Sequence, residues 1–452
     1  MKTHYDTMSS ERALLIGVGW KRSPRFPGMP AGEPERESLA ELVELARSAG
    51  AEIAGTIFQM RDSADPATLV GKGKLEEIRA EAVARDVPLI IFDRNLSPIQ
   101  QRNIESVTEC RVIDRTQLIL DIFARHARSR EGQLQVELAQ LNYLLPRLTG
   151  RGASMSRLGG KGGGAAGRIG VRGPGEKKLE TDRRRIRERV QKIQKGIDQI
   201  RKQRTLRREA RQAVPLGTIA MVGYTNAGKS TLFNALSRAE VLVSSRMFAT
   251  LDPTIRAIRL PSNRRVLVSD TVGFIRDLPK GLLNAFRATL EEVQEAALIV
   301  QVSDVSNPHH AELDDEVDKV LQELGVADRP RLRVFNKIDL LTPEQIAPLR
   351  HPYAGIHEGG PVLVSAKTGQ GLDELLRRMD MALPIDPVVT LALRLPMSEG
   401  RTLALIHALG KVLHSEVEDA HMNLRAEVPV SVARRLRLSS FLRSGTSGAL
   451  PA

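Results

Sequence analysis

The stretch G-Y-T-N-A-G-K-S, residues 223–230, decides the fold of the second half of the chain. It follows an apolar run, residues 217–222, that predicts a buried strand, and it leads into a helical pattern over residues 231–236. A strand, spaced glycines and Lys-Ser at the start of a helix are the context of a phosphate-binding loop. The glycines let successive backbone N–H groups point at an anion, and the helix N-terminus adds partial positive charge. The sequence therefore predicts a nucleoside-phosphate site here.

Two side chains of this loop have a predicted chemical role. Lys229 is expected on the terminal phosphates as a candidate catalytic residue, and the Ser230 hydroxyl is expected to bind Mg²⁺, a hard cation that takes oxygen ligands. A glycine turn without a ligand is the alternative, and the motifs downstream count against it. The predicted nucleotide contacts in the loop are Gly223, Tyr224, Thr225, Asn226, Ala227, Gly228, Lys229 and Ser230.

Length and charge limit the class of partner. A chain of 452 residues predicts about two to four domains. The formal net charge of +13 points to a polyanion, either nucleic acid or an acidic membrane surface. Cys110 is the single cysteine, so no intramolecular disulfide can form. The N-terminus lacks a signal-peptide core and no apolar run reaches the length of a membrane span. We expect a cytoplasmic protein without stable membrane insertion, and leave peripheral membrane association open.

Residues 1–114 alternate between β-rich runs and helical patterns. This alternation predicts a small N-terminal α/β domain with a mostly parallel sheet. The turn G-K-G-K at residues 71–74 lacks the spacing of a phosphate loop, and we interpret it as the start of a helix. No nucleophile with a base stands here, so the domain is predicted to bind or position a partner. The β-rich runs are residues 14–18, 53–59 and 89–92, and the helical patterns are residues 38–48 and 74–84.

Residues 115–215 predict an antiparallel helical hairpin. Helical patterns over 115–147 and 179–213 each carry an apolar seam, and either helix alone would leave that stripe in water. The first seam is Leu134, Leu138, Leu141, Leu145 and Leu148, and the second is Ile186, Val190, Ile193, Ile197 and Ile200.

The tip of the hairpin, residues 149–175, is rich in glycine and punctuated by arginine and lysine. Residues 151–215 hold 20 basic and 6 acidic side chains, an excess of +14 that accounts for the charge of the whole chain. A flexible linker is the alternative for the tip. A solvated helix face normally mixes both signs, so we favour contact with nucleic acid. Aromatic residues are nearly absent, so phosphates and RNA shape are the expected contacts.

Residues 216–384 predict the nucleotide domain, and two motifs complete its phosphate end. F-A-T-L-D, residues 248–252, is a threonine-bearing loop of the kind that orders around a third phosphate, and both Thr250 and Thr254 qualify to bind Mg²⁺. D-T-V-G, residues 270–273, follows a predicted strand at residues 265–269. There Asp270 can hold Mg²⁺ through water, and the N–H of Gly273, a candidate catalytic group, can sense the terminal phosphate. The predicted contacts are Phe248, Ala249, Thr250, Leu251, Asp252, Asp270, Thr271, Val272 and Gly273.

Two more motifs, N-K-I-D and S-A-K, predict a guanine pocket. Each follows a predicted strand, residues 331–335 and 361–364. The Asp339 carboxylate can accept from the guanine N1–H and exocyclic amine, whereas adenine presents an acceptor at N1 and no amine beside it. Asn336 is expected to brace the loops. The remaining expected contacts are the Lys337 stem on the base and the Ala366 N–H on the guanine carbonyl. GTP and GDP are the predicted substrate and product. The predicted contacts are Asn336, Lys337, Ile338, Asp339, Ser365, Ala366 and Lys367.

Phe274 stands where Ras-like GTPases carry the glutamine that orients the attacking water. Phenylalanine can neither donate nor accept there, so we expect slow hydrolysis that accelerates when the basic hairpin docks on RNA. Arg246 and Arg276 are alternative internal catalytic arginines, but we interpret them as surface charges. His309 and His310 are interpreted as part of a solvated loop.

Residues 385–452 predict a small C-terminal α+β domain. Apolar runs at residues 388–395, a helical pattern over 402–413 and further alternation at 416–430 support it. Residues from 444 onward are too small and glycine-rich to pack.

Taken in order, these motifs resemble the HflX family of bacterial translation-factor-related GTPases. The resemblance covers nearly the whole chain. It implies binding to the large (50S) ribosomal subunit and its rRNA, with the hairpin loop reaching towards the peptidyl-transferase centre. It also implies a role in splitting or rescuing stalled ribosomes or in their biogenesis. Of the two threonines it favours Thr250, as Mg²⁺ ligand and candidate catalytic residue. The upstream motifs that carry it are F-D-R-N-L-S-P-I-Q-Q-R-N, V-I-D-R-T-Q-L-I-L-D-I-F-A, L-Q-V-E-L-A-Q-L and R-G-P-G-E-K-K-L-E-T-D.

A second interpretation belongs to a different class of protein. In it the basic hairpin holds RNA or an acidic membrane surface, and GTP only regulates or stabilises this scaffold. The hairpin offers no clean apolar face beyond its seam, which counts against insertion in a bilayer. Nothing in the sequence demands more than a monomer.

Overall fold

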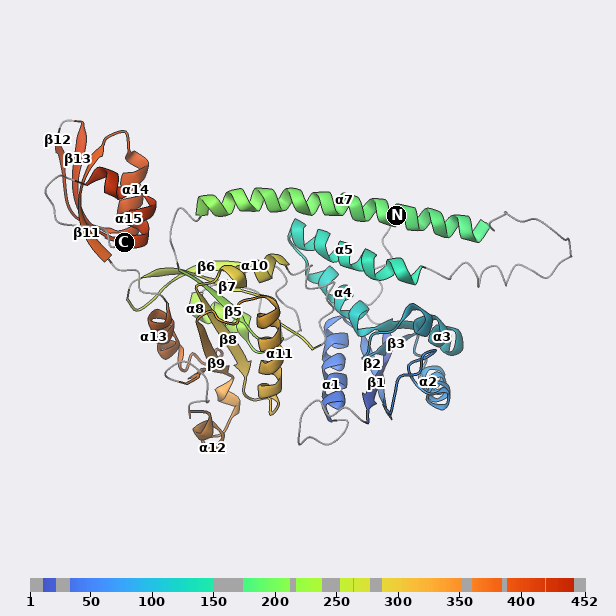
Figure 1. The fold of residues 1–452 in the computed structure, drawn as a ribbon. Helices are drawn as coiled ribbons and strands as arrows, with labels where there is room; N and C mark the ends of the chain where they lie inside the picture. The colour runs from blue at the N-terminus through green and yellow to red at the C-terminus, as the bar shows by residue number, and fades with distance from the viewer. Residues whose placement is uncertain are drawn as a thin grey trace.

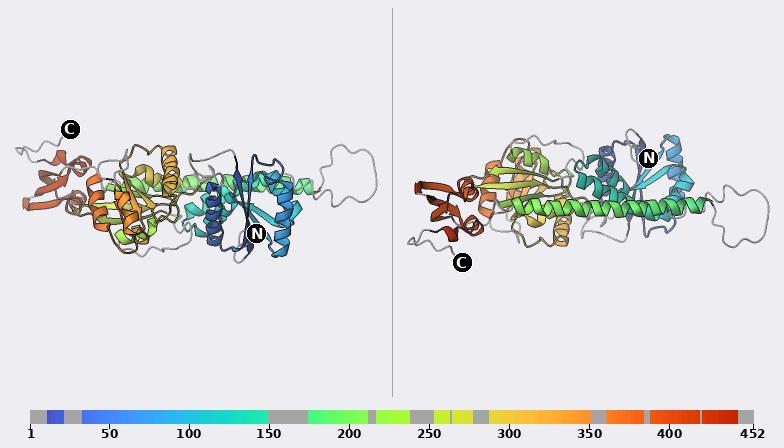
Figure 2. Two further views of the ribbon diagram at one scale, coloured as in Figure 1. Left: turned by 90° about the horizontal axis from the view of Figure 1, so that it is seen from below. Right: turned by 90° about the horizontal axis from the view of Figure 1, so that it is seen from above.

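The computed structural model describes residues 11–21, 33–148, 174–211, 217–237, 253–262, 264–276, 287–350, 360–383, 388–418 and 420–442. Figure 1 shows three sheets, each in its own globular unit, and one long helix, α7 (Pro174–Arg211), that lies across the first two units. The views in Figure 2 agree, with the three units arranged along the direction of α7. The expected α/β class is confirmed.

The N-terminal unit is a four-stranded parallel sheet with helices on both faces. Alternate residues of its central strand enter different cores, because side chains alternate across a strand. Leu15 packs with α1 and α4, whereas Ile16 packs on the other face with α2. The strand order is β2-β1-β3-β4. The strands are β1 (Arg12–Trp20), β2 (Glu52–Arg61), β3 (Leu89–Phe92) and β4 (Arg111–Asp114), and the helices are α1 (Glu33–Ser48), α2 (Lys72–Ala84), α3 (Pro98–Thr108) and α4 (Arg115–His126).

The turn expected before α2 is confirmed, with Gly71 as its N-cap residue. Helix α3 and strand β4 were not predicted, although α3 has a strong start signal in the sequence. The Ser97 hydroxyl accepts from the Gln100 N–H, the Gln100 side chain accepts from the Ser97 N–H, and Pro98 opens the helix. This capping box satisfies donors that a helix start otherwise leaves unpaired.

The predicted continuous helix over residues 115–147 is broken in the structure. Helix α4 ends at His126, and α5 (Arg130–Arg147) begins after Ser129, whose hydroxyl accepts from the Gly132 N–H. Helix α4 packs into the N-terminal core, and α5 pairs with α7. The boundary at residue 114 stays a prediction.

The apolar seam between α5 and α7 is confirmed in part. Leu134, Ile193 and Ile197 are buried together, and Leu138, Leu141 and Ile200 pack around them. Residues of the seams closer to the tip, such as Leu145 and Ile186, do not belong to this cluster. The glycine-rich tip at 149–173 lies outside the described residues.

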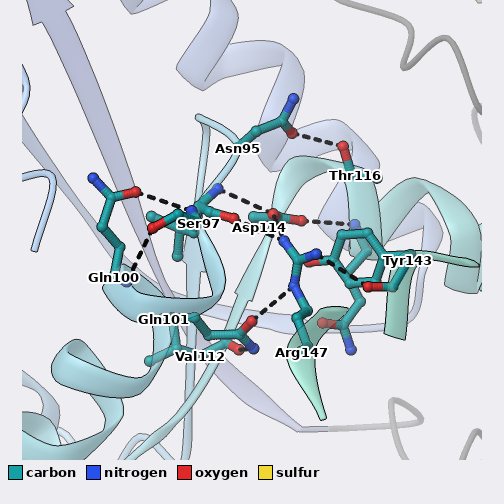
Figure 3. A network of polar contacts seen from close by, with 11 residues as sticks. Asn95, Ser97, Gln100, Gln101, Val112, Asp114, Thr116, Tyr143 and Arg147 are labelled. Carbon is teal, nitrogen blue, oxygen red and sulfur yellow. Dashed lines mark hydrogen bonds and ion pairs between the residues drawn. The ribbon is translucent and has the colours of Figure 1, made fainter. Parts of the chain in front are cut away.

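A buried polar network holds the end of α5 against the α/β domain (Figure 3). The Asp114 side chain, 1% exposed, accepts from Arg147 Nη2 at 3.0 Å and from the Leu96 N–H at 3.1 Å. Arg147 also donates to Gln101 Oε1, and its guanidinium lies 3.5 Å from the centre of the Tyr143 ring. The helix end from which the basic tip departs is therefore fixed to the N-terminal unit.

The central unit is a six-stranded sheet in the order β10-β9-β8-β5-β7-β6, parallel except for the pair β6–β7. The carboxyl ends of the parallel strands meet at one edge, where open α/β sheets bind ligands. The strands are β5 (Gly217–Val222), β6 (Thr254–Arg259), β7 (Arg265–Asp270), β8 (Leu298–Asp304), β9 (Arg331–Asn336) and β10 (Val362–Leu363). The helices are α8 (Lys229–Ser237), α10 (Arg287–Glu295), α11 (His310–Glu323), α12 (Pro343–Ile346) and α13 (Leu372–Ala382), with 3₁₀ turns η1 (Ile338–Leu340) and η2 (Ala347–Arg350).

One apolar core runs from the N-terminal unit into the central unit. Leu42 and Leu118 belong to the same buried cluster as Tyr224, Phe274 and Ile275. In Figure 1, α1 lies beside α11, which covers one face of the central sheet. The two units therefore share buried surface directly at the phosphate loop.

The C-terminal unit is an antiparallel sheet in the order β11-β13-β12, covered by short helices. The helix predicted over 402–413 stops at Leu409, and strand β12 begins at Lys411. Gly410 allows the close approach, because a Cβ there would lie 2.6 Å from the carbonyl oxygen of Glu427. Residues from 443 lie outside the described residues. The elements are β11 (Val388–Pro396), α14 (Gly400–Leu409), β12 (Lys411–Glu418), β13 (His421–Pro429), α15 (Val430–Arg435) and η3 (Leu438–Phe441).

Candidate nucleotide-binding site

The phosphate loop connects β5 to α8 at the carboxyl edge of the central sheet. Gly223 has φ +149°, and a Cβ there would lie 2.2 Å from the carbonyl oxygen of Val302. Gly228 has φ +90°, and its Cβ would lie 2.3 Å from Asn336 Nδ2. Neither position accepts a side chain, so both glycines are required by the path of the loop.

Lys229 begins α8 and lies inside the curl of the loop. It is 6% exposed, and its ammonium donates to the carbonyl oxygens of Gly223 at 3.1 Å and Tyr224 at 2.8 Å. Burial lowers the pKa of Lys229 to about 8, while the charge of Asp270 acts in the opposite direction. The loop therefore holds a desolvated cation, and a bound phosphate would stabilise its charged form.

Ser230 and Asp270 come together beneath the loop. Asp270 ends β7 and is fully buried, and its Oδ2 accepts from the Ser230 hydroxyl at 2.7 Å. A hydroxyl and a carboxylate are hard oxygen donors, so this pair fits Mg²⁺. The other predicted ligand, Thr250, belongs to residues 248–252, which lie outside the described residues together with Arg246.

The segment after β7 folds back onto the phosphate loop. The Thr271 hydroxyl donates to the Met221 carbonyl at 2.5 Å, tying β7 to β5. The Phe274 N–H donates to the Gly223 carbonyl at 3.1 Å, and the Thr225 N–H donates to the Phe274 carbonyl at 2.8 Å. Because of these two bonds, movement of the segment is coupled to the loop.

The predicted guanine end is built from β9 and the turn after β10. Asn336 Nδ2 donates to the Ala227 carbonyl at 2.9 Å, and the Ala366 N–H donates to Asn336 Oδ1 at 3.0 Å. Asn336 therefore joins the phosphate loop to the S-A-K turn. The Ser365 hydroxyl donates to Asp339 Oδ1 at 2.7 Å, which orients the carboxylate.

The remaining predicted residues of this end lie around that frame. Lys337 has φ +67°, and its ammonium donates to Asp304 Oδ2 at 2.6 Å. Ile338 is buried and Lys367 is exposed. The described part of the predicted set thus gathers along one sheet edge, with the basic side chain of Lys337 held by a carboxylate from the end of β8.

Sequence reasoning missed a set of contacts between the phosphate loop and α1. The Tyr224 hydroxyl donates to Glu41 Oε1 at 2.6 Å and accepts from the Arg276 N–H at 2.8 Å. Burial, followed by the charge of Glu41, raises the pKa of Tyr224 well above its usual value. Glu41 also accepts from Arg115 at 2.5 Å, and Arg115 in turn donates to Asp93 at 2.7 Å. A buried polar chain therefore connects the N-terminal sheet to the loop.

Two interpretations of the sequence are wrong at this interface. Arg276 is not a surface charge, because it is 6% exposed and its Nη2 donates to Glu37 Oε2 at 2.9 Å. His309 is not solvated, because its Nε2 lies 2.5 Å from Glu37 Oε1 and its side chain is 24% exposed. Neither residue has a sequence signal, since their shared partner Glu37 lies on α1, far away in the chain.

A cavity of about 290 Å³ lies between α1, α11 and the phosphate loop. Its walls include Glu37 and Glu41 from α1, Thr225 and Asn226 from the loop, and His310 from α11. The cavity therefore borders the outer side of the predicted phosphate site.

Three family models match the chain in succession. They are described as "GTP-binding GTPase N-terminal" for residues 36–124, "GTP-binding GTPase Middle Region" for residues 126–211 and "50S ribosome-binding GTPase" for residues 218–337. Together with the phosphate loop and the N-K-I-D edge, they define the class of protein as a P-loop GTPase.

Relatives identify the family within that class. "GTPase HflX" of Caldanaerobacter subterraneus is 43% identical over 428 residues, covering 94% of this chain and 93% of the relative. "GTPase HflX" of Escherichia coli K12 is 42% identical over 437 residues, covering 96% and 97%. The chain belongs to the HflX family of GTPases.

A solved structure is also similar to this chain. A GTP-binding protein from the archaeon Sulfolobus solfataricus in complex with GDP is 24% identical, with a TM-score of 0.42, and the match covers 82% of this chain and 98% of that one.

Proposed function

We propose that this chain binds GTP and GDP at the carboxyl edge of the central sheet and hydrolyses GTP there. The observation that carries the proposal is Asn336, whose amide joins the phosphate loop to the S-A-K turn and so makes one continuous site from two motifs. Lys229 meets the terminal phosphates and Gly273 senses the third phosphate. Asp339 reads guanine with the geometry that Ser365 imposes on it.

In the proposed site, Mg²⁺ is held by Ser230 and Thr250, with Asp270 acting through water. The support for the ion is the donor set, since the Ser230 hydroxyl and the buried Asp270 carboxylate lie 2.7 Å apart beneath the loop. When bound, Mg²⁺ supplies neutralisation of charge on the phosphate oxygens.

Hydrolysis in the free protein is proposed to be slow and to be stimulated by the ribosome. The support is Phe274, which is 5% exposed and packs in the apolar core shared with α1. Its side chain offers no hydrogen bond to a water molecule. Docking of the hairpin on RNA is proposed to reorder the loops around Thr250 and Phe274.

The proposed partner is the large ribosomal subunit. The chain binds it as a monomer, through the hairpin of residues 115–215 and its basic tip at 149–175. Helix α7 supports this, because Arg184 and Arg185 are 73% and 66% exposed and most described basic side chains around them are also exposed. The matching family model described as 50S ribosome-binding and the HflX relatives support the same partner.

Splitting or rescue of stalled ribosomes, or a part in ribosome biogenesis, is the proposed outcome, in the cytoplasm. None of the described helices is long and apolar enough to cross a bilayer.

The test is co-sedimentation with purified large subunits at stepped salt, with GDP or a non-hydrolysable GTP analogue. The wild type should pellet more strongly with the analogue. A variant with Arg184→Glu, Arg185→Glu and Arg187→Glu should bind more weakly, with a salt slope smaller by about 3 if each arginine meets one phosphate.

The control reverses charge on two other helices, α13 and α11 of the central unit. Arg377 and Lys319 are 63% and 62% exposed on α13 and α11, so Arg377→Glu with Lys319→Glu should leave binding unchanged. Equal loss in both variants, or wild-type binding to anionic vesicles alone, would contradict the proposal.

A further inference from the structure

Residue 274 is a phenylalanine, so it contributes no polar side chain to the phosphate end of the site. Phe274 uses its backbone N–H and carbonyl to bridge the phosphate loop, and its ring is buried in apolar surroundings. A GTPase still has to orient a water molecule towards the third phosphate. The orienting group must therefore come from another position near Gly273.

Thr225 has a hydroxyl without a structural role in the described residues. The side chain is 7% exposed, and its Oγ1 is buried without a hydrogen-bond partner there. Leaving a buried hydroxyl unpaired costs about 1–3 kcal/mol, so such groups are uncommon and call for an explanation. The Thr225 backbone, in contrast, is fixed by its N–H bond to the Phe274 carbonyl.

Thr225 lies beside the groups that would meet the third phosphate. A Cβ built on Gly273 would lie 2.9 Å from Thr225 Cα, 3.0 Å from Thr225 Cγ2 and 2.9 Å from Lys229 Nζ. The threonine side chain and the lysine ammonium thus contact the same glycine. Residue 273 must be glycine for this approach, because any side chain would collide with both.

Thr225 lines the cavity between the two units. That cavity, about 290 Å³, is lined by Thr225 and by polar groups of α1 and α11, among them Glu37, Asp304 and His310. A cavity of this size has room for several water molecules, each of which needs two or more polar partners. Thr225 thus belongs both to the wall of this cavity and to the contact with Gly273.

We infer that Thr225 is a catalytic residue whose hydroxyl binds and orients the attacking water, the task that residue 274 cannot perform. The water oxygen forms a bond to the γ-phosphorus, and the bond from that phosphorus to the β,γ-bridging oxygen breaks. The electron pair leaves with GDP, and the water proton passes to the phosphate released. This inference rests on the proposed nucleotide site.

The test compares Thr225→Val, which keeps the shape and removes the hydroxyl, with Thr225→Ser, which keeps the hydroxyl. Thr225→Val should slow single-turnover hydrolysis by about 10²-fold, the usual effect of removing one orienting hydrogen bond in a transition state. Thr225→Ser should stay within a few-fold of the wild type. Thr225→Val should bind GDP and a non-hydrolysable GTP analogue as the wild type does, yet bind GDP with aluminium fluoride more weakly.

Thermal unfolding separates this role from a structural one. Because the hydroxyl has no partner in the described residues, Thr225→Val should unfold no earlier than the wild type. A wild-type hydrolysis rate, a parallel loss of GTP-analogue affinity, or an earlier unfolding of Thr225→Val would each overturn the inference. If the wild type itself bound no guanine nucleotide, the proposed function would fail first, and the two failures are thereby distinguished.

Discussion

The contact between Tyr224 and α1 leads to a quantitative prediction for the variant Tyr224→Phe. The phenol is 8% exposed, and its oxygen bonds both the Glu41 carboxylate and the Arg276 N–H. A hydrogen bond to a charged group contributes about 1.5–3 kcal/mol, and an unpaired buried N–H costs about 1–3 kcal/mol. Because the two terms overlap in one site, we expect the interface to lose about 2–4 kcal/mol.

Hydrogen exchange is the assay, because it reports local opening rather than unfolding of the whole chain. A loss of about 2–4 kcal/mol corresponds to exchange about 30- to 1,000-fold faster. Peptides that contain Arg276 and residues 37–44 of α1 should show this change. Peptides from β11 and β13 in the C-terminal unit should not, since no described contact joins them to Tyr224.

A double-mutant cycle with Glu41→Gln isolates the pair. Glu41 also accepts from Arg115, so Glu41→Gln weakens the interface by itself, and the cycle removes that part. The coupling between Tyr224 and Glu41 should exceed about 1 kcal/mol. Unchanged protection in Tyr224→Phe, or a coupling near zero, would refute the reasoning that this hydroxyl holds the loop to α1.

Three further predictions concern buried charges. Arg147→Met leaves the Asp114 carboxylate, 1% exposed, without its ion-pair partner, so the free energy of unfolding measured in urea should fall by about 3–5 kcal/mol. Arg184→Met, on the exposed face of α7, should lower it by less than about 0.5 kcal/mol. Equal losses in the two variants would contradict this prediction. Burial raises the pKa of Asp121 to about 6 from 3.8, so the folded state binds the proton more tightly than the unfolded state does. The free energy of unfolding should therefore fall by about 3 kcal/mol as the pH rises from about 4 to 6. Asp121→Asn should remove this fall, and a pH profile unchanged in the variant would count against the prediction. Burial lowers the pKa of Lys229 to about 8, and a bound phosphate favours its charged form. Calorimetry in buffers of different ionisation enthalpy should therefore show proton uptake on GTP binding above about pH 8 and none near pH 6. Equal uptake at the two pH values would exclude Lys229 as the group that binds the proton.

The sequence predicted the elements of the site well because its signals are local. The apolar run before Gly223 is strand β5 at the predicted bounds, and the strand before Asp270 is extended by a single residue. The seam of α5 and α7 was visible because leucine and isoleucine recur at helical spacing, and three of these residues form its buried centre. Such patterns follow from the geometry of a single helix or strand.

What the sequence did not predict depends on contacts between distant segments. Tyr224 and Glu41 are separated by 183 positions, and Arg276 and Glu37 by 239. No periodicity connects such pairs, so Arg276 read as a surface charge. The break between α4 and α5 was missed for a different reason: the Ser129 cap competes with a helical pattern that continues on both sides.

The proposed guanine pocket depends on Asp339, and one substitution tests it most directly. Asp339→Asn replaces an acceptor by a donor beside the guanine amine, while Ser365 can still donate to the remaining oxygen. Calorimetry should show GTP affinity falling by at least about 10²-fold, and xanthosine triphosphate, which carries a carbonyl in place of that amine, should bind the variant more tightly than GTP does. Wild-type affinity for GTP in Asp339→Asn, with no gain for the xanthine nucleotide, would contradict the account.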